Sequence, residues 1–328
     1  MNKTDFVNKI FSLKKSDSDF EALALQVFAY QFQSVSVYNQ FCSHLGRTPE
    51  NVNSISNIPF MPIQFFKKHE LVDQNPVQKT FLSSGTGDYN QRSKHMVADL
   101  NVYNQSAQKA FAHFFGSEPI KILALLPNYL EQGDSSLVYM VNQFLYQPHC
   151  SGSFYGADYE QLNADLKIAI KNGERVLLWG VTYALLEFAA QFPQDLCGHF
   201  VLETGGMKGR RRELTRVEVH AELTSAFNLE NVWSEYGMTE LLSQAYSKGD
   251  GIFNTPPWMK ILLTDINDPL GIKSHGKSGR INVIDLANIH SCSFIATDDL
   301  GWLKSDGSFG VIGRIDGSQT RGCNLLRL

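Results

Sequence analysis

Apolar residues near the start of the chain recur at steps of three or four, from Leu25 to Leu45. This spacing places them on one face of an α-helix, so we expect a helix over residues 20–45. Gly46 follows directly and can adopt the left-handed backbone that closes many helices. The next segment, IPFMPI at residues 58–63, contains two prolines and is not predicted to lie inside a helix.

From residue 80 onward, short apolar runs alternate with segments of helical periodicity. Apolar runs bounded by turns are typical of buried parallel strands. The expected strands are residues 120–126, 175–179 and 200–203, and the expected helices are 101–115, 136–144, 159–172, 182–192 and 212–227. Such alternation predicts an α/β fold, with a parallel-sheet body and helices on both faces.

The pattern changes beyond residue 250, where short strand-like runs are joined by Gly and Asp turns. These runs are residues 261–263, 280–285 and 293–296. We therefore expect two parts. Residues 1–250 form a helical N-terminus plus the α/β body, and residues 251–328 form a small β-rich C-terminal subdomain.

Composition narrows the class of protein. The chain has 328 residues, 43% of them hydrophobic, enough for a packed core. Its 33 acidic residues outnumber its 29 basic ones, which argues against nucleic acid as a partner. The N-terminus has no signal-peptide pattern, and no apolar run is long enough to span a membrane. Five scattered cysteines without a C-x-x-C pair indicate a reduced, cytoplasmic protein with no zinc site.

A run of small residues follows the strand-like segment 80–82. Backbone N–H groups and hydroxyls of such a run can converge on one phosphate anion, whereas the alternative is an ordinary surface turn. The run consists of Ser83, Ser84, Gly85, Thr86 and Gly87.

A second candidate phosphate loop, GIKSHGKS at residues 271–278, satisfies the P-loop pattern letter for letter. A working P-loop is followed by a helix whose N-terminus faces the phosphates. Here Gly279 and the alternating segment 280–285 indicate a strand. We interpret this match as a chance β-turn.

The segment SEYGMTE, residues 234–240, is expected to leave a strand, turn at Gly237 and begin a helix. At such a helix start the Thr239 hydroxyl can hold a phosphate and the Glu240 carboxylate can hold Mg²⁺, while Tyr236 can stack on a base. The alternative is a helix N-cap with an acidic first turn.

Two acidic residues, Asp298 and Asp299, follow the predicted strand 293–296, and Arg314 lies in the GRIDG motif at residues 313–317. A carboxylate placed after a strand can accept both hydroxyls of a ribose. A turn or a metal site is the alternative.

In their order, these motifs resemble the adenylate-forming (ANL) superfamily of acyl-CoA synthetases and AMP ligases, over residues 80–322. The segment IPFMPIQFFK at residues 58–67 and the short chain are similar to the acyl-protein synthetases (LuxE-type) and the phenylacetate-CoA-ligase-like branch. The resemblance implies the large N-terminal domain of these enzymes. The matched motifs are SSGTG, ETGG at residues 203–206, YGMTE, TDDLG at residues 297–301, GRID and RG at residues 321–322.

The resemblance also implies site roles. The run at residues 83–87 would cradle the β- and γ-phosphates of ATP. Gly205 and Gly206 would lie against adenine, with Tyr236 stacking on it beside Gly237.

On the same basis, Thr239 would contact the α-phosphate and Glu240 would hold Mg²⁺. Asp299 would bind the ribose hydroxyls, and Arg314 would reach the ribose or a phosphate. Asp298 stands where the family has glycine. Because the sequence ends soon after the hinge residue Asp316, we expect the mobile lid domain and its lysine to be absent.

The implied function is ATP-dependent activation of a fatty or aryl carboxylic acid to acyl-AMP, with transfer to a thiol. The acceptor would be a protein, a carrier protein or coenzyme A. The alternative is a catalytically weak nucleotide- or acyl-binding subunit that works only within a multiprotein complex.

Cys323 is the candidate acyl carrier. Acyl-protein synthetases are thought to carry the acyl group on a cysteine near the C-terminus, and the nearby Arg314 and Arg321 favour a reactive thiolate. A buried structural cysteine is the alternative.

Overall fold

The computed structural model describes residues 3–84, 92–126, 133–205, 214–266, 268, 270–272 and 277–315. The chain forms two compact units. The first is built on Met1–His113, Gly237–Ala245 and Asn254–Gln319, and the second on Phe114–Tyr236 and Tyr246–Phe253. The domain boundary near residue 250 stays a prediction.

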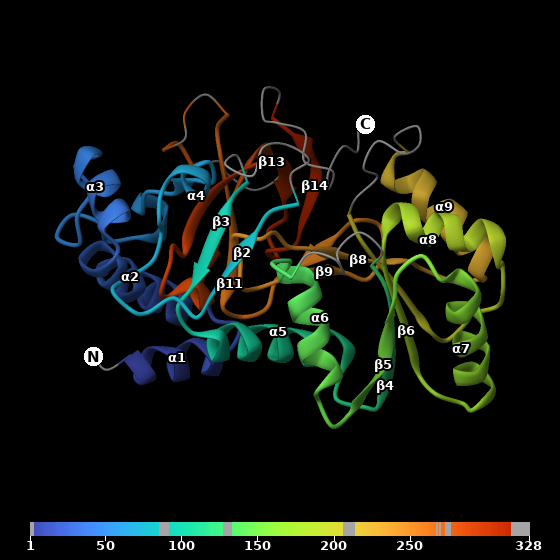
Figure 1. Ribbon diagram of the computed structural model, residues 1–328. Coiled ribbons are helices and arrows are strands. Elements are labelled where there is room, and N and C mark those ends of the chain that lie inside the picture. Colours follow the sequence, from blue (N-terminus) through green and yellow to red (C-terminus); the bar gives the residue numbers. More distant parts are fainter. Residues whose placement is uncertain are drawn as a thin grey trace. The chain divides into compact units, whose positions relative to one another are not determined.

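The second unit is built around a parallel β-sheet with strand order β8-β7-β6-β4-β5 (Figure 1). The strands are β4 (Ile120–Leu125), β5 (Cys150–Tyr155), β6 (Val176–Val181), β7 (Phe200–Thr204) and β8 (Trp233–Tyr236). The short strands β9 (Ala245–Ser247) and β10 (Phe253–Asn254) follow β8 in the sheet. The predicted strands coincide with β4, β6 and β7 to within two residues.

The edge strand β5 was not predicted from the sequence. Its residues, CSGSFY, contain no apolar run, and they alternate between exposed and partly buried until Tyr155. The strand forms because it pairs with β4 along all six residues.

Five helices lie between residues 100 and 227, and the first of them belongs almost wholly to the first unit. They are α5 (Leu100–Phe115), α6 (Ser136–Leu145), α7 (Tyr159–Lys171), α8 (Thr182–Gln191) and α9 (Arg216–Phe227). Figure 1 shows α6 on one side of the parallel strands and α7, α8 and α9 on the other. Among the described helices, none combines the length and apolar character needed to cross a bilayer.

Only α9 departs from its predicted bounds by more than one residue, beginning at Arg216 and not at residue 212. The cause is a capping box. The Thr215 hydroxyl accepts a hydrogen bond from the Glu218 N–H at 3.2 Å, and the Glu218 carboxylate accepts one from the Thr215 N–H at 2.7 Å. This reciprocal pair fixes where the helix begins.

The first unit contains the predicted β-rich C-terminal part. Four antiparallel strands lie in the order β11-β12-β13-β14, and β1 pairs with β13 in parallel. They are β1 (Met61–Pro62), β11 (Met259–Thr264), β12 (Ser278–Asp285), β13 (Phe294–Leu303) and β14 (Phe309–Arg314). A separate hairpin pairs β2 (Lys79–Leu82) with β3 (Lys94–Val97).

The N-terminal helices of this unit are α1 (Lys3–Ser12), α2 (Asp17–Ser34), α3 (Ser36–His44) and α4 (Phe65–Lys68). The prediction of one helix over residues 20–45 was wrong, because Val35 is extended and separates α2 from α3. The Asn39 side chain donates to the Phe32 carbonyl at 2.6 Å, which supplies a partner near the end of α2. Gly46 has φ +62°, the left-handed conformation expected of a helix end.

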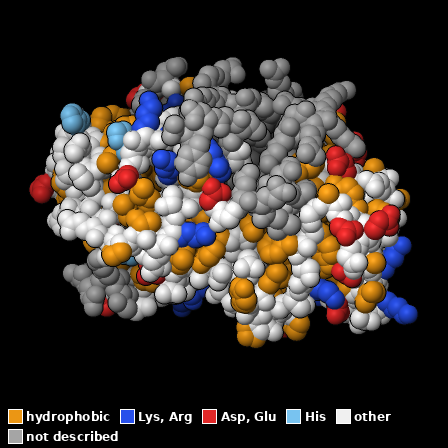
Figure 2. All heavy atoms as spheres, viewed as in Figure 1, with side chains coloured by type: hydrophobic (Ala, Val, Ile, Leu, Met, Phe, Trp, Pro, Cys, Tyr) orange, Lys and Arg blue, Asp and Glu red, His pale blue; other side chains and the backbone are white. Residues whose placement is uncertain are grey.

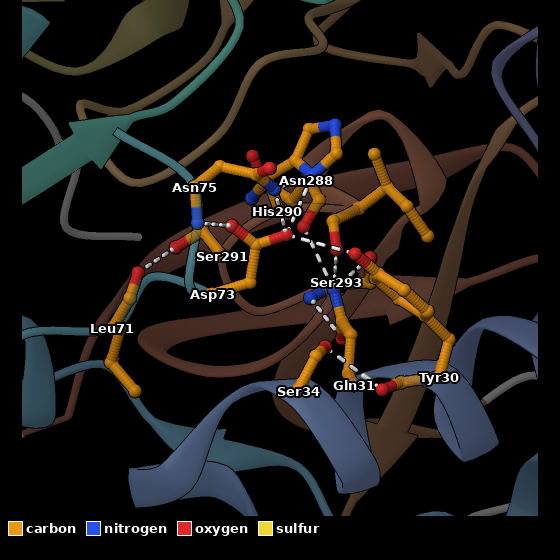
Figure 3. A network of polar contacts seen from close by, with 11 residues as sticks. Tyr30, Gln31, Ser34, Leu71, Asp73, Asn75, Asn288, His290, Ser291 and Ser293 are labelled. Carbon is orange, nitrogen blue, oxygen red and sulfur yellow. Dashed lines mark hydrogen bonds and ion pairs between the residues drawn. The ribbon is translucent and has the colours of Figure 1, made fainter. Parts of the chain in front are cut away.

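Buried polar contacts connect α2 to the link between β12 and β13 (Figure 3). The Gln31 amide donates to the carbonyls of Asn288 and Ile289 at 2.8 and 3.1 Å, and accepts from the Ser293 N–H at 3.0 Å. Since Gln31 is fully buried, this one side chain satisfies main-chain groups that no water reaches.

A second set of contacts in Figure 3 centres on Asp73. Its Oδ2 accepts hydrogen bonds from the Tyr30 hydroxyl at 2.9 Å and His290 Nδ1 at 2.8 Å. Burial would raise the pKa of Asp73, but the hydrogen bonds from His290, Asn75 and Tyr30 lower it to about 2. Asp73 is therefore ionised, and its carboxylate connects α2, through Tyr30, to the segment after β12, through His290.

We expect Gln31→Met to lower the free energy of unfolding by about 2–4 kcal/mol, because it leaves buried carbonyl and N–H groups without partners. Denaturant titration measures this loss. The exposed Gln33, on the same helix, gives the matched control Gln33→Met, which should change stability by less than about 0.5 kcal/mol. Equal losses for both variants would contradict the buttressing role of Gln31.

Candidate active site

The β2–β3 hairpin closes just before the run of small residues. The Ser83 N–H donates to the Ser93 carbonyl at 3.0 Å, and the Ser83 hydroxyl accepts from the Ser93 N–H at 2.9 Å. Arg92 Nε donates to the Ser83 carbonyl. Ser83 and Ser84 are thus placed where the hairpin ends, whereas Gly85, Thr86 and Gly87 lie outside the described residues.

Basic side chains gather over the β2–β3 hairpin in Figure 2, and the hairpin itself contains Lys79 and Lys94. Positive charge beside the run of small residues suits a phosphate ligand. The competing P-loop match has no such context, since β12 begins at Ser278 and Lys277 precedes a strand, as predicted.

Tyr236 ends β8 in the second unit and is buried, with its ring 5.9 Å from the ring of Phe253. The helix predicted to begin at Thr239 does not form. Residues 239 and 240 make a turn, and residues 241–244 lead into β9.

The reason for this difference lies in side chains from distant parts of the first unit. The first bond of the expected helix would join the Ser243 N–H to the Thr239 carbonyl. Instead, the Ser243 N–H donates to Asp285 Oδ2 at 2.9 Å, and the Thr239 carbonyl contacts His95 Nδ1 at 2.8 Å. The next carbonyl, that of Glu240, accepts from Asn288 Nδ2 at 2.8 Å.

Asp285 makes further hydrogen bonds to the loop that follows Thr239 and Glu240. Its buried carboxylate also accepts hydrogen bonds from the Leu242 N–H at 2.9 Å and the Ser243 hydroxyl at 2.6 Å. Thr239 remains partly exposed, whereas the Glu240 side chain is fully buried.

A carboxylate oxygen is the kind of ligand that Mg²⁺ prefers, and Mg²⁺ commonly takes only one or two protein carboxylates together with substrate phosphates. Glu240 therefore fits as one such ligand. Among the described residues, no three His, Cys, Asp or Glu side chains gather as a closed metal site.

Asp299 and Arg314 face each other across β13 and β14. Arg314 Nε lies 3.4 Å from Asp299 Oδ1, and the Asp299 side chain is almost fully buried. The predicted strand end before these residues was wrong, because β13 continues through both Asp298 and Asp299.

The acidic pair stays in the strand because each carboxylate has its own partner. Gln64 Nε2 donates to Asp298 Oδ1 at 2.5 Å, and Arg314 Nε lies against the Asp299 carboxylate. Gln64 belongs to the IPFMPIQFFK segment, whose Met61 and Pro62 pair with β13. This segment thus supports the residue that replaces the family's glycine.

In the second unit, a cluster of polar side chains lies where β6, β7 and β8 end. Thr182 donates to Glu203 Oε2 at 2.8 Å, and Thr204 donates to Glu235 Oε2. His220 Nε2 is 3.8 Å from Glu203 Oε1. Gly205, the predicted adenine contact, follows Thr204 directly, and Gly206 lies outside the described residues.

The two carboxylates of this cluster differ in charge state. Burial alone would raise the pKa of Glu203, but the hydrogen bond to His220 and the charge of Arg216 hold it below its usual value. Burial, together with the charge of Glu203, raises the pKa of Glu235 to about 7. Glu203 is therefore the ionised member and Glu235 carries a proton near neutral pH.

The fold is that of the adenylate-forming ligases. A 2-hydroxyisobutyryl-CoA ligase in the postadenylation state aligns with a TM-score of 0.70 at 11% identity, covering 96% of this chain and 72% of that one. ATP-bound MatB from Rhodopseudomonas palustris aligns with a TM-score of 0.56 at 17% identity, covering 84% and 56%. A comparison with curated protein sequences found no match.

The sequence itself gives the family. The model of the acyl-protein synthetase family, LuxE, matches residues 8–327. The chain belongs to this family, and its membership and fold support an AMP-forming ligase.

Sequence reasoning missed His95, Asn288 and Asp285, which hold the Thr239–Glu240 loop, and Glu235. His95, Asn288 and Asp285 each contact a residue of the loop that is 42 to 144 positions away in the sequence, so no local pattern marks them. Glu235 lies inside the SEYGMTE motif, next to Tyr236, but the burial and the Glu203 charge that raise its pKa depend on how other strands pack against it.

We expect the stability gained by the protonated Glu235 to be lost as pH rises from about 4.5 to 7. In that range the folded chain holds a proton that the unfolded chain has released, so unfolding becomes easier with pH. Glu235→Gln should remove this pH dependence. At pH 8 its free energy of unfolding should exceed that of the wild type by about 1–3 kcal/mol. Denaturant titration at several pH values measures the difference.

The exposed Glu230 provides the control. Glu230→Gln should leave the pH dependence of the wild type unchanged. Parallel stability curves for wild type and Glu235→Gln would show that Glu235 does not carry the buried proton.

Proposed function

We propose that the protein activates a carboxylic acid with ATP and passes the acyl group to a thiol. The match of the acyl-protein synthetase family over residues 8–327 carries this proposal. The held loop at Thr239 and Glu240, and the buried Asp299 opposite Arg314, support it. The chain spans only 72% and 56% of the two ligases described above, so their activities are not transferred whole.

In the first step, a carboxylate oxygen of the acid attacks the α-phosphorus of ATP, and pyrophosphate leaves. Basic residues of the β2–β3 hairpin and the run at residues 83–87 bind the phosphate tail. Thr239 offers its hydroxyl to the α-phosphate, Asp299 accepts the ribose hydroxyls, and Tyr236 lies against the adenine. Such positioned donors lower the barrier because they need no reorganisation as charge develops.

Mg²⁺, when bound, neutralises phosphate charge, and Glu240 would be its ligand from this chain. Among the structurally similar ligases, MatB is bound to ATP, and the 2-hydroxyisobutyryl-CoA ligase is bound to 2-HIB-AMP and CoA. This supports ATP as the activating substrate.

In the second step, a thiolate attacks the acyl carbonyl, a thioester forms and AMP leaves. We assign Cys323 as this thiol. It lies within the matched family region but outside the described residues. A fatty or aryl acid is the proposed substrate class, and a protein, a carrier protein or coenzyme A is the final acceptor.

The alternative is a nucleotide- or acyl-binding subunit that is active only in a complex. ATP–pyrophosphate exchange by the purified chain, across a panel of fatty and aryl acids, distinguishes the two. Exchange with any of these acids supports the enzyme. Nucleotide binding without exchange, restored by added partner proteins, supports the subunit.

Two variants should separate the metal site from the ribose site. Glu240→Gln should raise the Mg²⁺ concentration needed for half-maximal exchange, because a neutral amide is a poorer ligand for a hard cation. Asp299→Asn should weaken ATP and AMP binding alike, by about tenfold or more, without changing the metal requirement. Exchange assays and calorimetry measure these effects.

Lys277→Ala is the control, since Lys277 belongs to the rejected P-loop match and should leave ATP binding unchanged. Loss of ATP binding in this variant would overturn the choice of phosphate loop. An identical Mg²⁺ response in Glu240→Gln and Asp299→Asn would contradict the division of roles.

Cys323→Ser should abolish acyl labelling while leaving exchange intact. The protein is incubated with ATP, Mg²⁺ and a labelled fatty acid, and the label is measured before and after treatment with hydroxylamine, which cleaves thioesters. Label on the wild type should be lost on this treatment. Label that persists on Cys323→Ser would assign the acyl group to another residue. Cys197, which is exposed, gives the matched control Cys197→Ser, which should label as wild type does.

A further inference from the structure

We propose that His95 is a positioning residue for the adenylation step. Its imidazole holds the main chain at Thr239 and thereby fixes the Thr239–Glu240 loop against the hairpin that carries the phosphate-binding run. This inference rests on the proposed function, and it assigns His95 a role that none of the matched motifs contains.

The geometry joins two parts of the site through one side chain. His95 lies in β3, two residues after Ser93, whose N–H donates to the Ser83 hydroxyl. Its Nδ1 is 2.8 Å from the Thr239 carbonyl oxygen. All these residues belong to the first unit, so the connection is internal to one compact body.

The contact defines the tautomer of the ring. A carbonyl oxygen only accepts, so Nδ1 must carry the proton. Nε2 is buried and has no hydrogen-bond partner among the described residues. Burial lowers the pKa of His95 to about 4, although the nearby Glu240 opposes this effect, so the ring is neutral at physiological pH.

The surroundings restrict how the ring can move. The Phe66 ring packs edge-on against His95 with 5.7 Å between ring centroids, and the His95 side chain is almost fully buried. His95 and Asn288 also line one small cavity of about 10 Å³, room for about one water molecule. Consecutive carbonyls, those of Thr239 and Glu240, are thus held by two side chains that share this cavity.

This arrangement replaces the bonds that a helix would make at the same carbonyls. A loop without that ladder depends on its side-chain contacts for its position. A displacement of about 1 Å in a positioning group can reduce a rate by about 100-fold. His95 therefore acts on Thr239 and Glu240 through the main chain and does not itself touch the substrate.

The test compares three substitutions at one position. His95→Leu removes the donor and keeps an apolar, buried side chain. His95→Asn keeps a donor, since its amide nitrogen takes the place of Nδ1. His95→Gln keeps an amide but places it near Nε2, and it replaces His95→Leu if that variant does not fold.

We expect His95→Leu or His95→Gln to lower kcat for ATP–pyrophosphate exchange by about 10- to 100-fold, with a smaller change in KM for ATP. His95→Asn should stay within about fivefold of wild type. Val27→Ala, a buried change in α2 that does not line this cavity, should keep kcat and serves as the control at an equal loss of melting temperature.

Three results would overturn the inference. His95→Leu could exchange at the wild-type rate, Val27→Ala could lose as much kcat at equal stability, or His95→Asn could be as slow as the other variants. The last result would show that the imidazole matters for something other than its Nδ1 donor. A wild type that shows no exchange with any acid would instead refute the proposed function, so the two failures are distinguishable.

Discussion

The buried carboxylate of Asp285 determines the course of the chain after Glu240. It accepts hydrogen bonds from two consecutive N–H groups, from the Ser243 hydroxyl and from the Ala287 N–H, so both its oxygens are occupied. Together with His95 and Asn288, this acceptor competes with the helix that the YGMTE segment favours. The loop that presents Thr239 is therefore made by residues more than forty positions away.

The segment around Asp285 is itself supported from the start of the chain. Asn288 holds the Glu240 carbonyl, and Gln31 of α2 in turn holds the Asn288 carbonyl. Side chains from β3, β12 and the link after β12 thus converge on one loop, and α2 supports that link. This explains why the N-terminal helices and the C-terminal strands belong to the same compact unit although the second unit lies between them in the sequence.

The sequence predicted those elements whose signal is local. Apolar runs gave β4, β6 and β7, and helical periodicity gave α5 through α8 almost to the residue. The periodicity failed at Val35 because buried positions continue at helical spacing across the break, from Phe28 through Val35 to Cys42. It failed at β5, which has no apolar run, and after Glu240, where contacts of long range override local preference. Motif order named Thr239, Glu240, Asp299 and Arg314, but it could not name the side chains that hold them.

The opposition of Asp299 and Arg314 on neighbouring strands has a consequence for turnover. The Arg314 guanidinium faces the carboxylate that would receive a ribose. Under the proposed role, an arriving nucleoside competes with an internal partner for the same oxygen, and a departing one is replaced by that partner. Under that role, the contact would lower the affinity for ATP and AMP alike, which favours release of AMP.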